Sequence, residues 1–236
     1  MLQVQSFTKR YGRLPALTDV SFSVREGEVL GLIGPNGSGK TTLFECMGGV
    51  LPLDGGALVR GGRPVSARER ASMLFYLPDQ IAPWPAQTVR WAIEFTIGFF
   101  GGNAELRDRV VEELDVAPLL DATIGSLSKG QRKRALLAIG LLMPHALLLA
   151  DEPFDGLDLR QSRDVARTLR AYAAEGRALF LSIHQIRDAA RVCDRFVLLS
   201  GGRARGEGTI RELAALAAAR GASAGDDLEE VFLALT

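Results

Sequence analysis

The stretch that decides the fold spans residues 29–42 and reads VLGLIGPNGSGKTT. Its first five residues form a nearly apolar run followed by glycine, which is typical of a buried β-strand. Residues 34–41 then fit the pattern G-x-x-x-x-G-K-[ST], and a helix is predicted over residues 40–48. Glycines in this pattern let backbone N–H groups close around an anion, and the helix dipole adds positive potential. An ordinary glycine-rich turn is the alternative, but the flanking strand and helix favour a phosphate-binding loop (P-loop).

The end of this loop carries the side chains that bind a nucleotide. Lys40 can reach the β- and γ-phosphates, and the Thr41 hydroxyl can coordinate Mg²⁺. The predicted nucleotide-binding residues of the loop are Gly34, Pro35, Asn36, Gly37, Ser38, Gly39, Lys40, Thr41 and Thr42.

A pair of acidic residues follows a second apolar run. Residues 146–150 read ALLLA, and Asp151 and Glu152 come next. Ligands bind at the carboxyl ends of strands in open α/β sheets, so these carboxylates are expected near the P-loop. A P-loop site needs an acid for magnesium and a group that positions the attacking water. Asp151 is the candidate metal partner, directly or through water, and Glu152 the candidate general base. The alternative is two acids that simply end a strand at the solvent.

Composition limits the class of protein. The chain has 236 residues, of which 47% are hydrophobic and 24% charged, which suits one or two domains with a real core. The 28 basic and 28 acidic residues give a net charge of zero, which argues against a nucleic-acid partner, although a local basic patch stays open. Two distant cysteines, Cys46 and Cys193, argue against a disulfide framework or a Cys-based zinc site.

Membrane-spanning and secretory segments are not predicted. The N-terminus has no apolar core typical of a signal peptide. The longest nearly apolar stretch, residues 135–150, is interrupted by Pro144 and His145, whereas a span needs about 20 residues. We therefore expect a soluble chain that another protein holds at a membrane if it acts there.

Periodicity and turn residues divide the rest of the chain into an α/β pattern. Strands are predicted over residues 20–24, 73–77, 178–183 and 196–199, with a short one inside 52–62. Helices are predicted over residues 89–100, 106–114, 132–142, 160–175 and, with a break at 221–225, through 210–236. The strand–helix–strand order across 146–183 predicts a parallel sheet. Residues 80–145 are mostly helical, so we expect a helical subdomain inserted into one domain formed by residues 1–79 and 146–236.

The segment LSKGQ at residues 127–131 carries a resemblance to a known family. Ser128 and Gln131 have the spacing of a capping box, which alone would explain them. The segment lies between the P-loop and the Asp-Glu pair, however, and in that order the chain resembles the nucleotide-binding subunit of ATP-binding cassette (ABC) transporters. LSKGQ resembles the LSGGQ signature of this family, with Lys129 in place of the first glycine. The resemblance covers nearly the whole chain and implies a RecA-like P-loop NTPase core with an antiparallel β subdomain.

The resemblance also assigns further residues. Tyr11 matches the aromatic residue that stacks on adenine, and His184 matches the switch histidine at the γ-phosphate. At the position of the Q-loop glutamine stands Asp79, with Gln80 one residue later. Either Gln80 fills the role through a shifted loop, or Asp79 replaces the glutamine, or Pro78-Asp79 is merely a turn. The signature residues Leu127, Ser128, Lys129, Gly130 and Gln131 would contact ATP on a partner, and Asp155, Gly156, Leu157 and Asp158 resemble the D-loop.

The implied activity is hydrolysis of ATP with Mg²⁺ by a head-to-tail dimer with a second copy or a paralogous subunit. The dimer would drive transport through an integral membrane permease subunit, as a peripheral protein on the cytoplasmic face of a bacterial membrane. Residues 228–233 resemble the tails of bacterial drug-exporter ATPases, which with Asp79 favours export. The alternative functions are a soluble ABC-type ATPase in DNA repair or translation, and a P-loop kinase or GTPase.

Two clusters remain ambiguous in the sequence. Residues 81–101 hold Trp84, Trp91, Phe95, Phe99 and Phe100, and this neighbourhood receives a cytoplasmic helix of the membrane subunit in the family. We expect some of these aromatic side chains in the core and a minority, such as Trp84, in a docking groove. The basic run at residues 132–134 either adds positive potential near ATP or forms a solvated helix face.

Overall fold

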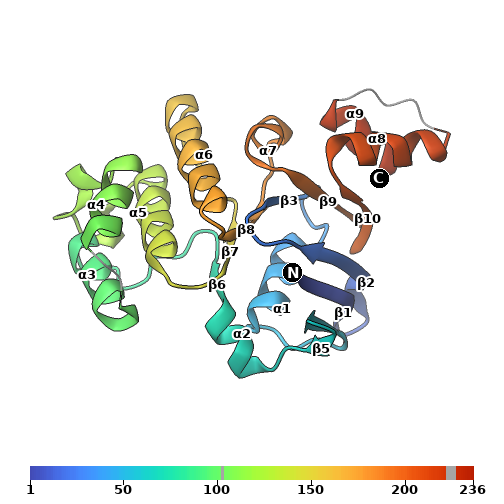
Figure 1. Cartoon of the computed structure of the whole chain (residues 1–236), viewed down its shortest axis with the longest axis horizontal. Helices are drawn as coiled ribbons and strands as arrows, with labels where there is room; N and C mark the ends of the chain where they lie inside the picture. Colours follow the sequence, from blue (N-terminus) through green and yellow to red (C-terminus); the bar gives the residue numbers. More distant parts are fainter. Residues whose placement is uncertain (102–103, 222–226) are drawn as a thin grey trace.

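A mostly parallel sheet forms the centre of the computed structural model, which describes residues 1–101, 104–221 and 227–236 (Figure 1). Its six strands have the order β10-β9-β3-β8-β7-β6. The parallel strands are β6 (Leu74–Leu77), β7 (Leu147–Asp151), β8 (Ala178–Ser182), β3 (Val29–Ile33) and β9 (Arg195–Ser200), and β10 (Arg203–Gly208) pairs antiparallel to β9. Every residue of β3, β7 and β8 is buried, which explains their continuous apolar runs.

A second, antiparallel sheet covers one side of this core. It has the order β2-β1-β4-β5 and consists of β1 (Leu2–Tyr11), β2 (Leu14–Val24), β4 (Gly55–Arg60) and β5 (Arg63–Pro64). Its apolar face shares a core with the parallel sheet and with α1 (Lys40–Gly48). The Phe180 ring lies 4.9 Å from Phe44 of α1 and 5.2 Å from Phe22 of β2, measured between centroids. The P-loop helix is thereby anchored between the two sheets.

Helices α3 (Val89–Phe100), α4 (Ala104–Glu113) and α5 (Lys129–Leu142) gather at the end of the molecule opposite the antiparallel sheet (Figure 1). Two short 3-10 turns, Ala117–Leu119 and Ile124–Ser126, connect α4 to α5. The remaining helices are α2 (Ala67–Met73), α6 (Leu159–Ala174), α7 (Ile186–Val192), α8 (Ile210–Ala219) and α9 (Leu228–Leu235). No helix in the described ranges is both long and apolar enough to cross a bilayer.

The predicted helices and strands agree best with the structure where the sequence carries a clear signal, such as a glycine, for the end of an element. The helices over residues 40–48 and 89–100 have the predicted bounds, since Gly49 and Gly101 end them in the left-handed conformation. The predictions missed β1, β5, β10, α2 and α7. In β1 a register shift between Val4 and Phe7 breaks the alternation that would have indicated a strand. The tail is helical as expected, but most of its predicted break, residues 222–225, lies outside the described residues.

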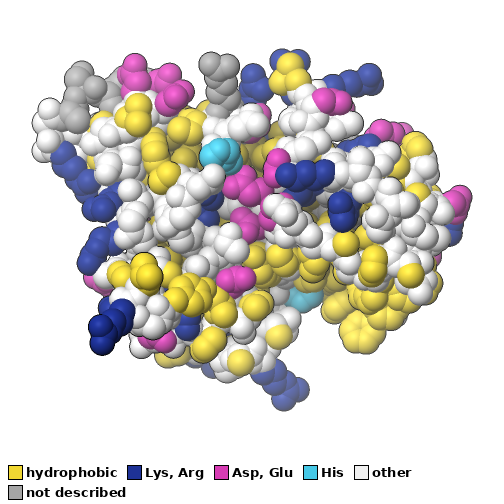
Figure 2. Space-filling model, turned by 180° about the vertical axis from the view of Figure 1, so that it is seen from behind, with side chains coloured by type: hydrophobic (Ala, Val, Ile, Leu, Met, Phe, Trp, Pro, Cys, Tyr) yellow, Lys and Arg dark blue, Asp and Glu magenta, His cyan; other side chains and the backbone are white. Residues whose placement is uncertain are grey.

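The aromatic residues of α3 and the preceding loop are exposed, contrary to the expectation that some belong to the core. The core side of α3 consists of small and β-branched residues, namely Val89, Ala92, Ile93 and Thr96. The exposed fractions range from 37% to 72% for Trp84, Trp91, Phe95, Phe99 and Phe100, which we call the aromatic patch. Figure 2 shows a hydrophobic area at the lower right, over the end of the molecule that α3 occupies.

Candidate active site

The loop after β3 closes in a way that only glycine permits. Gly37 and Gly39 have φ values of +78° and +105°, a region that other residues rarely adopt. A Cβ atom at Gly34 would lie 2.3 Å from the Leu199 carbonyl oxygen, and one at Gly39 would lie 2.7 Å from that of Ala16. Gly37 is therefore required by its backbone conformation, Gly34 by space, and Gly39 by both.

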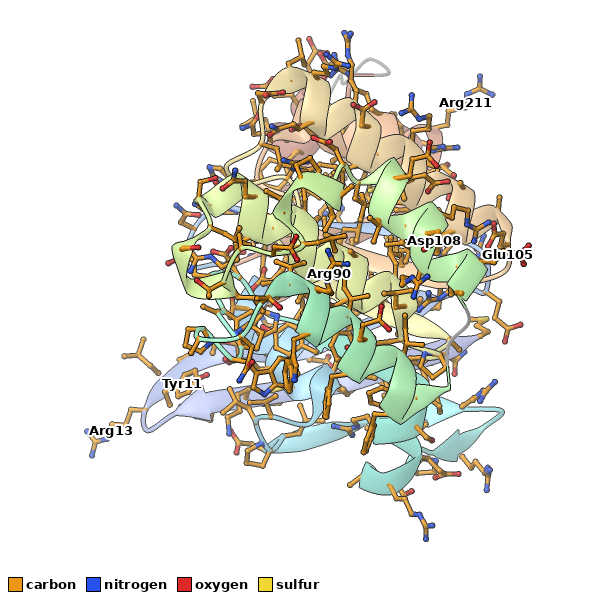
Figure 3. All side chains as sticks on the ribbon, turned by 90° about the vertical axis from the view of Figure 1, so that its left-hand side faces the viewer. Tyr11, Arg13, Arg90, Glu105, Asp108 and Arg211 are labelled. Carbon is orange, nitrogen blue, oxygen red and sulfur yellow. The ribbon has the colours of Figure 1, made fainter. Side chains whose placement is uncertain are left out.

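Lys40 lies inside this loop. Its side chain is buried, and Nζ donates to the carbonyl oxygens of Gly34 at 2.8 Å and Pro35 at 3.3 Å. A buried ammonium held by the loop backbone leaves a concentrated positive charge where phosphates would enter. Tyr11 approaches the same loop from the tip of the β1–β2 hairpin, with its hydroxyl 3.5 Å from Thr42 Oγ1 (Figure 3). Tyr11 is 51% exposed, so a flat ligand could stack on its ring.

The acidic end of β7 meets the first turn of α1. Thr41 Oγ1 donates a hydrogen bond of 3.0 Å to Asp151 Oδ2, and Ser182 Oγ donates to Asp151 Oδ1. Ser182, fully buried at the end of β8, also accepts a 2.9 Å hydrogen bond from the backbone N–H of Glu152. The structure thus joins two predicted residues, Thr41 and Asp151, and adds Ser182, which the sequence analysis missed. The one sequence signal for Ser182 is a polar residue within an otherwise apolar strand.

Glu152 is held next to His184. Its Oε2 accepts a 3.1 Å hydrogen bond from the backbone N–H of His184, and both residues line a cavity of about 310 Å³ together with Asn36 and Gln80. Burial raises the pKa of Glu152 above its ordinary value, and the Asp151 charge acts in the same direction, while Lys40 and His184 oppose the shift. A carboxylate with a raised pKa accepts a proton more readily than an exposed one, as a general base requires.

A second cavity, of about 290 Å³, adjoins the first. It is lined by the P-loop and by three carboxylates, those of Asp79, Asp151 and Glu152. Asp79 and Glu152 border both cavities. Residues from three distant parts of the sequence therefore enclose one continuous region, and Figure 2 shows acidic side chains near the centre of one face.

Asp79 pairs with the helix that follows the signature segment. Lys133 Nζ donates to Asp79 Oδ1 at 2.7 Å and to the Asp151 carbonyl oxygen at 3.3 Å. Burial alone would raise the pKa of Asp79, but the hydrogen bond and charge of Lys133, with contacts to Gln80, hold the pKa below its usual value. Lys133 and Arg134 are buried, so a solvated helix face is the wrong interpretation for them. Arg134 instead donates to the carbonyl oxygens of Leu114 and Asp115.

The signature segment forms the predicted capping box. Gln131 N–H donates to Ser128 Oγ at 3.3 Å, and Ser128 N–H donates to Gln131 Oε1 at 3.0 Å. The segment also contacts the D-loop of its own chain: a Cβ at Gly130 would lie 2.5 Å from the Gly156 carbonyl oxygen, and Lys129 forms an ion pair with Asp155.

The remaining D-loop and signature residues have structural contacts. Leu127 is buried, the Leu157 side chain approaches Gly130, and Asp158 caps α6 by accepting from Gln161 N–H at 2.8 Å. No hydrogen bond or ion pair joins residues 127–131 to the P-loop in the part of the chain that the structure describes. Within one chain the two predicted ATP-contacting segments are thus separate.

A lysine in a glycine loop after a parallel strand, with a Thr–Asp contact and a half-buried glutamate beside it, defines a P-loop nucleotide-binding ATPase. The sequence profile of the family described as "ABC transporter" matches residues 17–155, and the chain belongs to this family. The ATP-binding domains of this family are ATPases that drive transport.

The individual relatives agree with this assignment. The chain is 30% identical to the SkfA peptide export ATP-binding protein SkfE of Bacillus subtilis, covering 86% of this chain and 87% of that protein. It is 34% identical to the lipopolysaccharide export system ATP-binding protein LptB of Acidithiobacillus ferridurans, covering 90% and 92%. The solved structure of an ATP-binding subunit of an ABC transporter superposes with a TM-score of 0.87 at 26% identity, covering 100% of this chain and 99% of that one.

Proposed function

We propose that this chain binds ATP with Mg²⁺ at the P-loop and hydrolyses it as half of a dimeric cassette, driving export through a separate membrane subunit. One observation carries the proposal: Lys40, the Thr41–Asp151 contact and Glu152 converge on two adjoining cavities. Membership of the ABC transporter family favours transport over the alternative of a soluble ATPase in DNA repair or translation.

The residues predicted to form the site have distinct roles in this proposal. The backbone of residues 34–39 and the Lys40 ammonium hold the phosphates, and the Tyr11 ring stacks on the adenine. The Thr41 hydroxyl and the Asp151 carboxylate are hard oxygen donors of the kind that Mg²⁺ prefers, so they fit the metal. When bound, Mg²⁺ would neutralise charge on the phosphates. Glu152 accepts the proton of the attacking water, and His184 lines the same cavity.

The signature segment acts on a second subunit, either another copy of this chain or a paralogue. The first turn of α5, behind the Ser128 cap, carries N–H groups that a helix does not satisfy internally, and such a helix end attracts phosphate. ATP bound to one P-loop would then bridge to the signature segment of the partner, with the D-loop beside it. ATP binding would assemble the dimer, and hydrolysis would release it.

The aromatic patch supports an integral membrane partner. Its rings stack on one another, with centroids 5.1 Å apart for Trp91 and Phe95 and 5.9 Å for Phe95 and Phe99. Exposed apolar patches of this kind mark protein interaction sites. We infer that a cytoplasmic segment of a permease docks here, with residues 80–145 acting as the helical subdomain and the rest of the chain as the core. The ATPase would then lie at the cytoplasmic face of a bacterial membrane, and the names of SkfE and LptB support export.

Two experiments test this function. The specific ATPase activity should rise with protein concentration, because the complete site needs two subunits; a constant specific activity down to nanomolar protein would contradict the dimeric mechanism. A tagged copy isolated from detergent-solubilised membranes should carry along an integral membrane protein. Replacing Phe95 and Phe99 by serine should abolish that capture, while Leu233→Ser, at an exposed position of α9 far from α3, should not (Figure 1).

A further inference from the structure

Asp79 places an extra negative charge where an anionic nucleotide must bind. The cavity at the P-loop is lined by the carboxylates of Asp79, Asp151 and Glu152, against the single ammonium of Lys40. Asp151 is held by Thr41 and Ser182, and Glu152 by the His184 backbone. Asp79 has no such partner on the P-loop side within the described residues. Its charge would repel phosphates unless a cation compensates it.

Lys133 is placed to supply that compensation. Its side chain is only 7% exposed, and its ammonium is fixed at two points, the Asp79 carboxylate and the Asp151 carbonyl oxygen. It approaches Asp79 from α5 and lines a third cavity, with Lys129 of the signature segment, and does not line the P-loop cavity itself. The ammonium therefore neutralises Asp79 from the side that faces α5, and it does not occupy the P-loop cavity in which the nucleotide would bind.

We propose that Lys133 is a positioning residue for ATP binding: it neutralises Asp79 and holds that carboxylate against α5, so that the site accepts the triphosphate. The inference rests on the proposed function, because it concerns the same ATP site. The proposed role of Lys133 differs from that of an ion pair that only holds α5 against the loop after β6. A structural tie would affect the stability of the fold, whereas a charge-compensating residue also affects the affinity of the folded protein for ATP.

A double-mutant cycle separates these two roles. Lys133→Gln, Asp79→Asn and the double variant are made in the full chain, and the Kd for ATP with Mg²⁺ is measured by calorimetry beside KM and kcat. Lys133→Gln should weaken ATP binding about tenfold and raise KM, because an unpaired carboxylate then faces the phosphates. Adding Asp79→Asn to Lys133→Gln should restore most of the lost affinity, because the charge that required compensation is gone.

Arg132→Gln is the matched control. Arg132 is the neighbouring basic residue on α5, is partly exposed, and forms no ion pair within the described residues. An equal loss of affinity in Arg132→Gln would show that general positive charge matters and would overturn the proposal. So would a Lys133→Gln protein that melts at a lower temperature but binds ATP like the wild type.

Folding failure of Lys133→Gln does not block the test. The double variant leaves no unpaired buried charge and should fold, and Lys133→Arg keeps the positive charge. If the proposal holds, ATP affinity in both of these proteins stays within about threefold of wild type, since the net charge facing the phosphates is preserved. Tenfold weaker binding in the double variant would contradict it. Failure of the wild-type chain itself to bind ATP would instead refute the proposed function.

Discussion

Ser182→Ala tests how the structure holds its two acidic residues. The Ser182 hydroxyl donates to the Asp151 carboxylate and accepts from the Glu152 backbone N–H, and the side chain is fully buried. Alanine at this position leaves Asp151 Oδ1 and the Glu152 N–H without the Ser182 hydroxyl, while Thr41 still donates to Asp151 Oδ2. A hydrogen bond to a charged group contributes about 1.5–3 kcal/mol, and an unsatisfied buried donor costs about 1–3 kcal/mol.

Because the two losses share one side chain and relax together, we expect the free energy of unfolding to fall by about 2–4 kcal/mol in total. In a chain of 236 residues, this loss lowers Tm by roughly 4–16 °C. The ATPase rate of the folded variant should also fall about ten- to a hundredfold, because both acidic groups lose their fixed positions.

Urea unfolding followed by circular dichroism measures the stability, and phosphate release measures the rate. Ser162→Ala is the matched control, since Ser162 is also buried but forms no side-chain hydrogen bond in the described part of the chain. The reasoning is refuted if Ser182→Ala unfolds within about 0.5 kcal/mol of the wild type, which is the range of neutral substitutions.

Three further predictions concern the site and the patch. Lys40→Ala should weaken ATP binding at least tenfold by calorimetry, because the phosphates lose their counter-charge; unchanged affinity would contradict the role of the loop. The raised pKa of Glu152 predicts that the ATPase rate falls on acidification at a higher pH than an ordinary glutamate would give. Because burial disfavours the ionised carboxylate, ionised Glu152 lowers the free energy of unfolding at pH values above its raised pKa. Glu152→Gln should therefore be more stable than wild type at pH 7, and this difference should vanish at acidic pH. Thermal melts that show the opposite trend would contradict a pKa raised by burial. Phe99→Ser, at a 72% exposed position, should leave the free energy of unfolding within about 0.5 kcal/mol of wild type, and a larger loss in urea unfolding would show that the patch is part of the core.

Local patterns in the sequence predicted much of the local structure of the candidate site. The strand β3, the P-loop and α1 are contiguous in the sequence. The apolar run and the glycine spacing therefore predict the order strand, loop and helix directly. The capping box of Ser128 and Gln131 is equally local and is confirmed. The phosphate cradle and the start of the signature helix are therefore predictable from neighbouring residues alone.

Long-range contacts were not predictable in the same way. Ser182 meets Asp151 because β7 and β8 pair in parallel with these two residues in register. Lys133 lies 54 residues from Asp79, and only the packing of α5 brings them together. Such pairings depend on tertiary register, which a single sequence does not contain.

Helical periodicity also did not show which face of α3 packs against the core. Both faces of the helix are apolar: one carries Val89, Ala92 and Ile93, and the other Trp91, Phe95 and Phe99. The larger rings suggested a core, but the smaller face packs inward because it allows closer approach to the neighbouring helix α5. The aromatic patch is thus left on the surface by a packing preference rather than by hydrophobicity.

The central claim is that Glu152 performs hydrolysis at an ATP site shared by two subunits. The most direct measurement combines light scattering with phosphate release for the Glu152→Gln protein, with and without ATP and Mg²⁺. The account predicts a dimer that forms with ATP and persists, with phosphate release at least a hundredfold below wild type, as expected when a general base is removed. A Glu152→Gln protein that releases phosphate at nearly the wild-type rate, or that stays monomeric with saturating ATP, would contradict it.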